Sequence, residues 1–479
     1  MYLKLSSGWL SDSDRVHMES RGGASGDPLL PAPPERAQAA SGSGMWDAVL
    51  SLTKTCVGTG VLALPWGFER GGALAVPGIV ALGVWNWYTA WQLLSAREAT
   101  PKEGLIGARS AYSAIVHASL GRGCVLLLEG SLCTVLIGVC ASLQINATEL
   151  LAHASGWGYQ PCLLATAVFL VPFARLRSLR RLAFVSATGL GMLAAGLVAV
   201  AAYGLASLPE WPPTASPSMM QLPSAEGLAD YVGIASFSFG VQAVLLPVQD
   251  GMAQPHRCAE ALGWALALVT ATYSVVGAGL AALYWRAPDG GVRQIILLNL
   301  PAGAATALHL SSSLVALLSY PLPLFPVIGL LSAAVGAAWH PGAAELPAPT
   351  ADALRMTVLA VTTLLAMMLR RFGIAASIIG CLGIVFCQLL PPLCHLRLCA
   401  WPPRPTAHDR AMGGNVSELA PPPHAHAAAS DQGSPAAPAQ RARRVRPLLA
   451  AVDVALVALA LVAFGYFTSL AIAGALTEG

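Results

Sequence analysis

The stretch KTCVGTGVLALPWG, residues 54–67, places two glycines and a threonine near the middle of an apolar run and a proline soon after them. The run extends from about residue 46 to 68, and crossing a bilayer takes about 20 mostly apolar residues. A helix interrupted at membrane depth is tolerated only where protein or a water-filled cavity satisfies the freed backbone groups. The stretch therefore predicts a membrane helix that is broken at a functional site.

A second stretch of the same kind, SFSFGVQ at residues 236–242, has a glycine in mid-run and Pro247 after it. Equivalent interruptions in two halves of a chain are typical of transporters built from inverted repeats. We count eleven apolar runs, of which the interrupted ones are the first and the sixth, and we keep 303–327 as one run with an extension despite its prolines. The approximate limits are 46–68, 73–96, 124–151, 160–174, 182–206, 229–250, 260–285, 303–327, 353–369, 373–396 and 448–475.

The composition excludes several classes of protein. Of 479 residues, 55% are hydrophobic and 11% are charged, and the mean hydropathy is +0.62, whereas a soluble domain carries about 25% charged residues. A soluble enzyme is therefore excluded, and a net charge of +3 indicates no nucleic-acid partner. The ten cysteines follow neither a disulfide nor a metal-ligand spacing. With no P-loop and no catalytic triad pattern, we expect no enzyme activity, cofactor or metal.

The segments outside the apolar runs define the predicted organisation. Residues 1–44 predict a disordered tail, residues 45–397 a ten-helix core with halves at 46–206 and 229–396, residues 398–447 a disordered linker, and residues 448–479 an eleventh helix. Lys and Arg prefer cytoplasmic loops. Placing the N-terminus in the cytosol puts 21 of the 27 basic residues on that side. Tail and linker are therefore predicted to be cytoplasmic.

The two interruptions together suit a zwitterion. Free N–H groups around Gly58, Thr59 and Gly60 offer partial positive charge to a carboxylate, and carbonyls around Ser236 to Phe239 would receive an ammonium group. The alternative is that the glycines let helices pack closely, and spacing alone does not decide between the two. The predicted substrate contacts are Thr55, Cys56, Gly58, Thr59, Gly60, Ser236, Phe237, Ser238, Phe239 and Gly240.

Five short motifs occur in an order that resembles the amino acid/auxin permease family. They are GTGVLALP at 58–65, LRSLRRLAFVS at 176–186, NLP at 299–301, SYPLPLFP at 319–326, and Gly380 with QLLPPLCH at 388–395. The resemblance covers roughly residues 46–475. It implies an all-α integral membrane protein of eleven transmembrane helices, with a LeuT-like five-plus-five inverted repeat and one extra helix. It also implies transport of amino acids by alternating access.

The resemblance bears on the coupling ion as well. Sodium-coupled members carry Asn four residues before the first motif glycine, and the proton-coupled branch carries Lys, as this chain does at Lys54. A fixed cation there would repel Na⁺, which favours H⁺. Two features leave coupling to Na⁺ as an alternative. Ser51 stands where proton-coupled animal members have His, and the serines at 311–313 could supply hydroxyl ligands for Na⁺.

Charged groups inside membrane spans are costly and are functional candidates by default. We single out Lys54, Glu129 and His309 as candidates for proton coupling. Each has a structural alternative. The side chain of Lys54 could reach to the membrane interface, Glu129 could be an anchor at the lipid headgroups, and His309 could be a core histidine bonded to a carbonyl. Asp453 is expected to be an anchor near the cytoplasmic end of the last span.

These inferences predict a proton-coupled carrier of small or neutral amino acids in a vacuolar, lysosomal or plasma membrane. Its partners would be the amino acid, H⁺ and the lipid bilayer. One alternative is an amino-acid sensor that keeps the carrier fold. The other is a Na⁺-coupled or auxin-type transporter of the same family.

Overall fold

The computed structural model describes residues 42–100, 110–176, 183–211, 220–287, 291–339, 347–400 and 436–478. Over these ranges the chain is helical and has no strand, apart from an isolated bridge between Ser43 and Met252. The longer helices are α3 (Met45–Cys56), α4 (Leu64–Gly71), α5 (Ala75–Ala99), α6 (Ala111–Leu120), α7 (Arg122–Ser155), α8 (Tyr159–Ala174), α9 (Ala183–Ser207), α10 (Ala225–Ser238), α11 (Gln242–Asp250), α12 (Cys258–Tyr284), α13 (Ala302–Ser319), α14 (Pro321–Trp339), α15 (Ala348–Leu369), α16 (Phe372–Ile384), α17 (Leu390–His395) and α19 (Ala436–Glu478). Short helices include η1 (Thr59–Leu62), η2 (Gly72–Leu74), η8 (Ile296–Asn299), η9 (Val385–Leu389) and η10 (Leu396–Ala400).

Nine helices of the described residues are long and apolar enough to cross a membrane. The eleven runs expected from the sequence differ from this number at two places. The first run is divided, so that α3 has only 12 residues and α4 continues into α5. The fourth run is α8, which has 16 residues. The multi-pass helical fold is confirmed, while the number eleven stays a prediction.

The proline-rich stretch after residue 301 forms a single long span, as expected. Its two segments, α13 and α14, meet at Tyr320, which keeps helical dihedrals of φ −53° and ψ −42°. The apolar span accordingly runs from Ala305 to Gly336 without interruption. Pro321 is tolerated because it begins α14, where an N–H would have no partner in that turn, whereas Pro326 lies inside the helix and removes one of its backbone donors.

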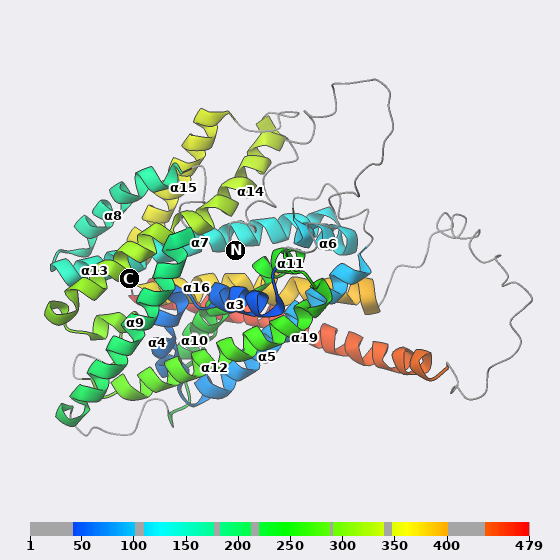
Figure 1. Ribbon diagram of the computed structural model, residues 1–479, viewed down its shortest axis with the longest axis horizontal. Helices are drawn as coiled ribbons and strands as arrows, with labels where there is room; N and C mark the ends of the chain where they lie inside the picture. Colours follow the sequence, from blue (N-terminus) through cyan, green and yellow to red (C-terminus); the bar gives the residue numbers. More distant parts are fainter. Residues whose placement is uncertain are drawn as a thin grey trace, which may run out of the picture.

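The helices form two groups that meet where α7 packs against α16 (Figure 1). In one group, α10 lies against α4 and α16, and α12 lies against α3, α4 and α5. In the other group, α7 lies against α8, α13, α14 and α15. The last helix, α19, packs along α10, α16 and α17. Both interrupted helices therefore belong to the first group.

The tightest contact in the first group joins α10 to α16 through small residues. A Cβ atom added to Gly380 would lie 1.8 Å from the carbonyl oxygen of Gly233, and one added to Gly233 would lie 2.3 Å from the carbonyl oxygen of Ser377. Small residues at such a crossing let two backbones approach closely. Hence α10 is held against α16 with no room for a side chain between them.

Two ion pairs hold the ends of the interrupted α10–α11 helix. Arg70, near the end of α4, lies 2.8 Å from Asp230 in α10. Arg97, near the end of α5, pairs with Asp250 at the end of α11. The two halves of the broken helix are thus fixed to α4 and α5 at opposite ends, and the break lies between them.

The tenth apolar run departs from α-helical geometry twice. The π-helical segments η9 and η10 flank α17, which contains Pro391 and Pro392. A proline removes a backbone donor and displaces the helical hydrogen bonds around it, and π segments often occur at functional sites. They set the direction of two side chains discussed below, Gln388 in η9 and His395 at the end of α17.

Candidate functional site

The first break separates α3 from η1. The N–H of Val57 still bonds to the carbonyl of Thr53 at 2.9 Å, but the N–H of Gly58 turns back to the carbonyl of Cys56 at 2.9 Å. Gly58 is extended, with φ −127° and ψ −155°. The regular hydrogen-bond ladder therefore ends at Cys56, as the sequence predicts.

The second break separates α10 from α11. Phe239, with φ −97° and ψ 17°, follows the last residue of α10, Ser238. The N–H of Val241 bonds to the carbonyl of Phe239 at 2.6 Å, and a regular helix resumes at Gln242. The break thus occupies residues 239–241, around the glycine that the sequence singled out.

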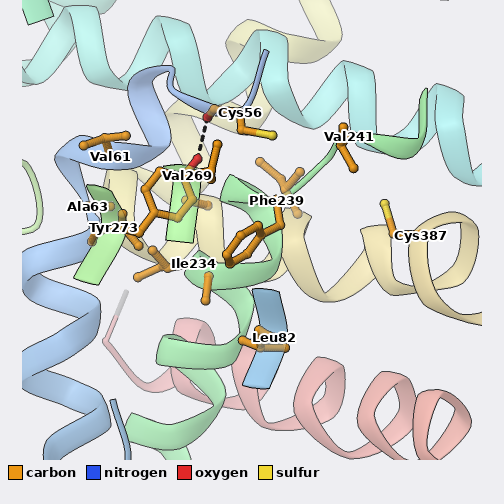
Figure 2. Packing of buried hydrophobic residues seen from close by; sticks show 14 of the residues in the cluster. Cys56, Val61, Ala63, Leu82, Ile234, Phe239, Val241, Val269, Tyr273 and Cys387 are labelled. Atoms are coloured by element: carbon orange, nitrogen blue, oxygen red, sulfur yellow. Dashed lines mark hydrogen bonds between the residues drawn. The ribbon is translucent and has the colours of Figure 1, made fainter. Parts of the chain in front are cut away.

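Tyr273 of α12 fastens the two breaks together. Its hydroxyl lies 2.7 Å from the carbonyl oxygen of Cys56 and 2.7 Å from that of Ser238, which are the last residues of α3 and α10. Figure 2 shows the tyrosine reaching toward Cys56, with Phe239 nearby, and the two rings pack edge to face at 5.2 Å. One phenolic proton is shared by two carbonyls at the ends of broken helices, of which that of Cys56 also accepts the N–H of Gly58. The two interrupted stretches predicted from sequence therefore meet at one point.

The glycines at the breaks have different surroundings. A Cβ atom at Gly60 would lie 2.8 Å from Oγ of Ser238 and 3.1 Å from the ring of Phe237, so Gly60 lets the two broken helices cross closely. A Cβ atom at Gly58 or at Gly240 would meet nothing within 4 Å. The packing interpretation therefore fits Gly60, whereas Gly58 and Gly240 each adjoin open space.

Several predicted contact residues bond within their own helices. The hydroxyl of Thr55 donates to the carbonyl of Ser51 at 2.9 Å, and that of Ser238 donates to Ile234 at 2.9 Å. Cys56, Ser236 and Phe239 are buried, while Thr59 and Phe237 are half-buried. The structure brings all of these residues to the two breaks, and their contact with substrate stays a prediction.

We expect Tyr273→Phe to lower the free energy of unfolding by about 1–3 kcal/mol, because it leaves two buried carbonyls without their shared donor. Thermal unfolding of the purified protein measures this change. Tyr466→Phe, at a half-exposed position in α19, is the matched control and should leave stability unchanged. Equal unfolding temperatures for wild type and Tyr273→Phe would contradict the bridging role.

The three candidates for ion coupling lie in different environments. Lys54 is half-buried in the last turn of α3, and Glu129 is half-buried in the first part of α7. His309 of α13 is fully buried, and its Nε2 lies 2.9 Å from the carbonyl oxygen of Leu297. The bond to a carbonyl matches the structural alternative for His309, but its Nδ1 is buried without a hydrogen-bond partner.

Sequence reasoning missed two titratable residues of α7, one of which lies beside His309. The imidazole of His153, on α7, lies 5.0 Å from that of His309, edge to face. Glu149, one turn earlier on α7, accepts a hydrogen bond from the N–H of Phe372 at the start of α16, at 2.9 Å. The i, i+4 spacing of Glu149 and His153 in an apolar run was the available signal, because it places both on one helix face.

The expectation for Asp453 was wrong. Its side chain has 0% exposure and is bonded to His395, Gln92 and Tyr88, so it does not anchor the helix at a headgroup. Two residues of α5 were also missed: Gln92, which donates to Asp453, and Asn86, which accepts hydrogen bonds from Gln242 and Gln388. Their spacing with Thr89, three residues apart, was a detectable sign of a polar face turned into the protein.

Metal chemistry has no support in the described part of the chain, where no group of three or more His, Cys, Asp or Glu side chains could hold an ion. All ten cysteines are free thiols. What the arrangement offers is backbone and hydroxyl groups at two helix breaks with open space beside them, which suits reversible binding of a small polar molecule.

The relatives found by comparison with known proteins are named as amino acid transporters. The chain is 26% identical over 293 residues to the vacuolar amino acid transporter 4 of Saccharomyces cerevisiae, covering 59% of this chain but only 40% of that protein. It is 27% identical over 379 residues to the vesicular inhibitory amino acid transporter of Mus musculus, covering 74% of this chain and 69% of that one. The chain thus spans less than half the length of the yeast relative and about two thirds of the mouse one.

Among solved structures, a Na⁺-coupled sialic acid symporter is similar with a TM-score of 0.46 and 13% identity, over 76% of this chain and 81% of that one. A manganese transporter from Eremococcus coleocola has a TM-score of 0.43 and 11% identity, over 92% and 98%.

The family itself is settled by the sequence profile of transmembrane amino acid transporter proteins, which matches residues 41–407. This range contains both helix breaks and all five motifs, so the resemblance to the amino acid/auxin permease family is confirmed. The chain therefore belongs to the family of transmembrane amino acid transporter proteins, which are carriers and not enzymes.

Proposed function

We propose that the chain is a secondary active carrier that moves small or neutral amino acids across a membrane by alternating access. The observation that carries the proposal is the junction at Tyr273, where the carbonyl ends of two broken helices meet beside glycines that adjoin open space. Broken helices in a membrane protein occur where they line a substrate site.

The proposed architecture is the LeuT-like one. Residues 45–397 form a ten-helix core of two inverted repeats, 46–206 and 229–396, residues 448–479 add an eleventh helix, and residues 1–44 and 398–447 are a cytoplasmic tail and linker. Two observations support this architecture. Each break lies in the first helix of its proposed half. The helices also pack as two groups, one of α3–α5, α10 and α12 and the other of α7, α8 and α13–α15. In this scheme the first group rocks against the second.

The proposed substrate site lies at the two breaks. The carboxylate of the amino acid binds backbone N–H groups around Gly58, Thr59 and Gly60, where the N–H of Gly58 would exchange its bond to the Cys56 carbonyl for one to the substrate. Its ammonium group binds carbonyls around Ser236 to Phe239. The two hydrogen bonds of the Tyr273 hydroxyl support the binding of the ammonium group, because carbonyl oxygens that share one donor keep lone pairs for a second donor. A small side chain fits best, since Phe237 and Phe239 both lie at this point.

We propose that transport is coupled to H⁺, with Lys54, Glu129 and His309 as candidates. The contact of buried His309 with half-buried His153 supports His309 most directly, since an imidazole with an unpartnered nitrogen can take up a proton. The serine hydroxyls keep the Na⁺ alternative open, because Ser311 donates to Leu308 and Ser313 donates to Ala147 at 2.8 Å, which leaves the oxygen lone pairs of both available to a cation. A Na⁺-coupled or auxin-type carrier is the alternative within the family.

The proposed location is a vacuolar or vesicular membrane, with the N-terminus in the cytosol. The names of the yeast and mouse relatives support an internal membrane, and the distribution of basic residues supports the orientation. A lysosomal or plasma membrane location is the alternative.

Uptake of a labelled mixture of neutral amino acids into proteoliposomes tests the proposal, first with an imposed pH gradient and then with a Na⁺ gradient. We expect accumulation with the pH gradient and none with Na⁺ alone. Gly60→Trp, which would drive an indole into Ser238 and Phe237, is the inactive control. Accumulation only with Na⁺ would overturn proton coupling, and binding without flux under either gradient would favour an amino-acid sensor.

A further inference from the structure

A stripe of buried polar side chains runs along α5 away from the break between α10 and α11. Asn86, Thr89 and Gln92 are each fully buried and are spaced by three residues, which places them on one face of the helix. Polar groups in a membrane span are costly to bury, so they are functional candidates by default. None of them belongs to the predicted substrate contacts.

The stripe begins at an amide cluster next to the second break. Oδ1 of Asn86 accepts hydrogen bonds from Nε2 of Gln242, the first residue of α11, and from Nε2 of Gln388 in η9, each at 3.1 Å. Nε2 of Gln242 also lies 3.2 Å from the hydroxyl of Thr89. The Oε1 atoms of Gln242, Gln388 and Gln92 are buried acceptors without a hydrogen-bond partner. Such acceptors are suited to bind water or a proton donor.

The stripe ends at a buried carboxylate on the last helix. Oδ1 of Asp453 accepts a hydrogen bond from Nε2 of Gln92 at 2.6 Å and one from the hydroxyl of Tyr88 at 3.3 Å. Its Oδ2 lies 2.6 Å from Nδ1 of His395, at the end of α17. The Asp453 side chain is 0% exposed and that of His395 is 5% exposed. Three helices, α5, α17 and α19, therefore meet at one carboxylate.

The other titratable groups facing this pair are few. The thiol of Cys399, in η10, interacts with the His395 imidazole, and Tyr88 faces Asp453 from α5. Of the basic side chains described on α5 and η10, that of Arg97 pairs with Asp250 and that of Arg397 is exposed. Among the side chains that the structure describes, His395 is thus the group that can neutralise Asp453.

A buried carboxylate and imidazole in contact hold one proton between them at no net charge. Removing that proton leaves a buried negative charge, and adding a second leaves a positive one, and either is costly in a membrane interior. Gain or loss of a proton would change the hydrogen bonds of Asp453, which join α19 to α5 and α17. Gln92, which donates to Asp453, lies one turn from Thr89 on the same face of α5, and Thr89 and Asn86 contact Gln242 at the start of α11, so a proton entering or leaving the pair acts on the helix that also borders the second break.

We propose that His395 and Asp453 form a proton-binding site at the junction of α5, α17 and α19, connected to the α10–α11 break by the Asn86–Thr89–Gln92 stripe. Its loading and unloading couple proton movement to the transport cycle. This rests on the carrier function proposed above, and it adds a site that the sequence candidates Lys54, Glu129 and His309 do not include.

Proteoliposomes allow coupling to be separated from binding and exchange. Counterflow, the exchange of labelled for unlabelled amino acid without a pH gradient, needs no net proton movement. We expect Asp453→Asn, which keeps the hydrogen bond from Gln92, to lose about tenfold or more of its pH-gradient-driven accumulation while counterflow stays within about twofold. Asp352→Asn, which removes a carboxylate paired with Arg355 on α15, is the matched control and should keep both activities.

The outcomes distinguish this site from the carrier function. Wild-type accumulation by Asp453→Asn overturns the proposal. Loss of counterflow together with accumulation, in protein that elutes as a single species, assigns the pair a structural role and also overturns it. Absence of counterflow in the wild type instead contradicts the carrier function.

A fluorescence titration tests proton binding without transport. The ring of Trp91 lies 5.7 Å from that of His395, and a protonated imidazole quenches indole emission. We expect the difference in emission between wild type and Trp91→Phe to change with pH in one step, and the step to disappear in His395→Gln. A pH-independent difference, or a step that persists in His395→Gln, would contradict protonation of the pair.

Discussion

Replacing Gly380 by alanine is expected to lower the free energy of unfolding by about 3 kcal/mol or more, at the upper end of the cost of adding a side chain to a packed contact. The added Cβ would lie 1.8 Å from the carbonyl oxygen of Gly233 and 2.6 Å from the backbone nitrogen of Phe237. Both are backbone atoms, so no side chain can turn aside and α10 must move away from α16. Thermal unfolding of the detergent-purified protein measures the loss.

The same helix offers a matched control. A Cβ atom at Gly383 would meet only the ring of Phe386, at 3.8 Å, which is an ordinary contact. Gly383→Ala should therefore be neutral or stabilise the protein by about 0.5–1 kcal/mol, as alanine does in a helix interior. Equal unfolding temperatures for the two variants would show that α10 and α16 do not pack as closely as the structure indicates.

The interrupted helices could be predicted because their signal is local. A glycine followed by a proline within an apolar run, as at Gly58 with Pro65 and Gly240 with Pro247, indicated a break without any knowledge of the partner helices, whereas Gly138 lies within the unbroken α7. The sequence could not separate Gly58 from Gly60, because that difference depends on Phe237 and Ser238, which lie far along the chain. Only the crossing of the two broken helices decides which glycine packs and which adjoins open space.

The roles of Tyr273 and Asp453 could not be predicted from the sequence, because they too depend on contacts with distant helices. Tyr273 is one of ten tyrosines, and its role arises from two carbonyls on other helices. Asp453 resembles a headgroup anchor by its position near the start of an apolar run, yet its environment is set by His395 and Gln92, 58 and 361 residues away. Long-range contacts of this kind leave no periodic trace in the chain.

Two groups of titratable side chains, one partly buried and one buried, lie toward opposite ends of the span that runs from α16 to η10. Glu149, one turn before His153 on α7, accepts a hydrogen bond from the N–H of Phe372 at the start of that span. His395, with Asp453, lies 23 residues later, which at 1.5 Å per residue is roughly 34 Å along the helix axis. The two groups are therefore separated along most of the length of this span.

Replacing Gly58 by leucine is expected to abolish amino-acid uptake, by about 100-fold or more, while the protein remains folded. The backbone at Gly58 is extended at φ −127°, which leucine adopts without strain, and an added Cβ meets nothing within 4 Å. Stability should therefore change little. The leucine side chain would occupy the open space beside the first break, where the proposed carboxylate site lies, and displacing a substrate from its bound position costs affinity and rate together.

Uptake into proteoliposomes and thermal unfolding, measured on the same preparation, separate the two effects. Gly279→Leu is the matched control, because that glycine is an exposed residue of α12 with no atom within 4 Å of an added Cβ, and it should keep both uptake and stability. Uptake at the wild-type rate by Gly58→Leu would place the substrate elsewhere. Loss of uptake with unchanged unfolding would locate the transported molecule at the break, since the glycine contributes nothing to packing that leucine could remove.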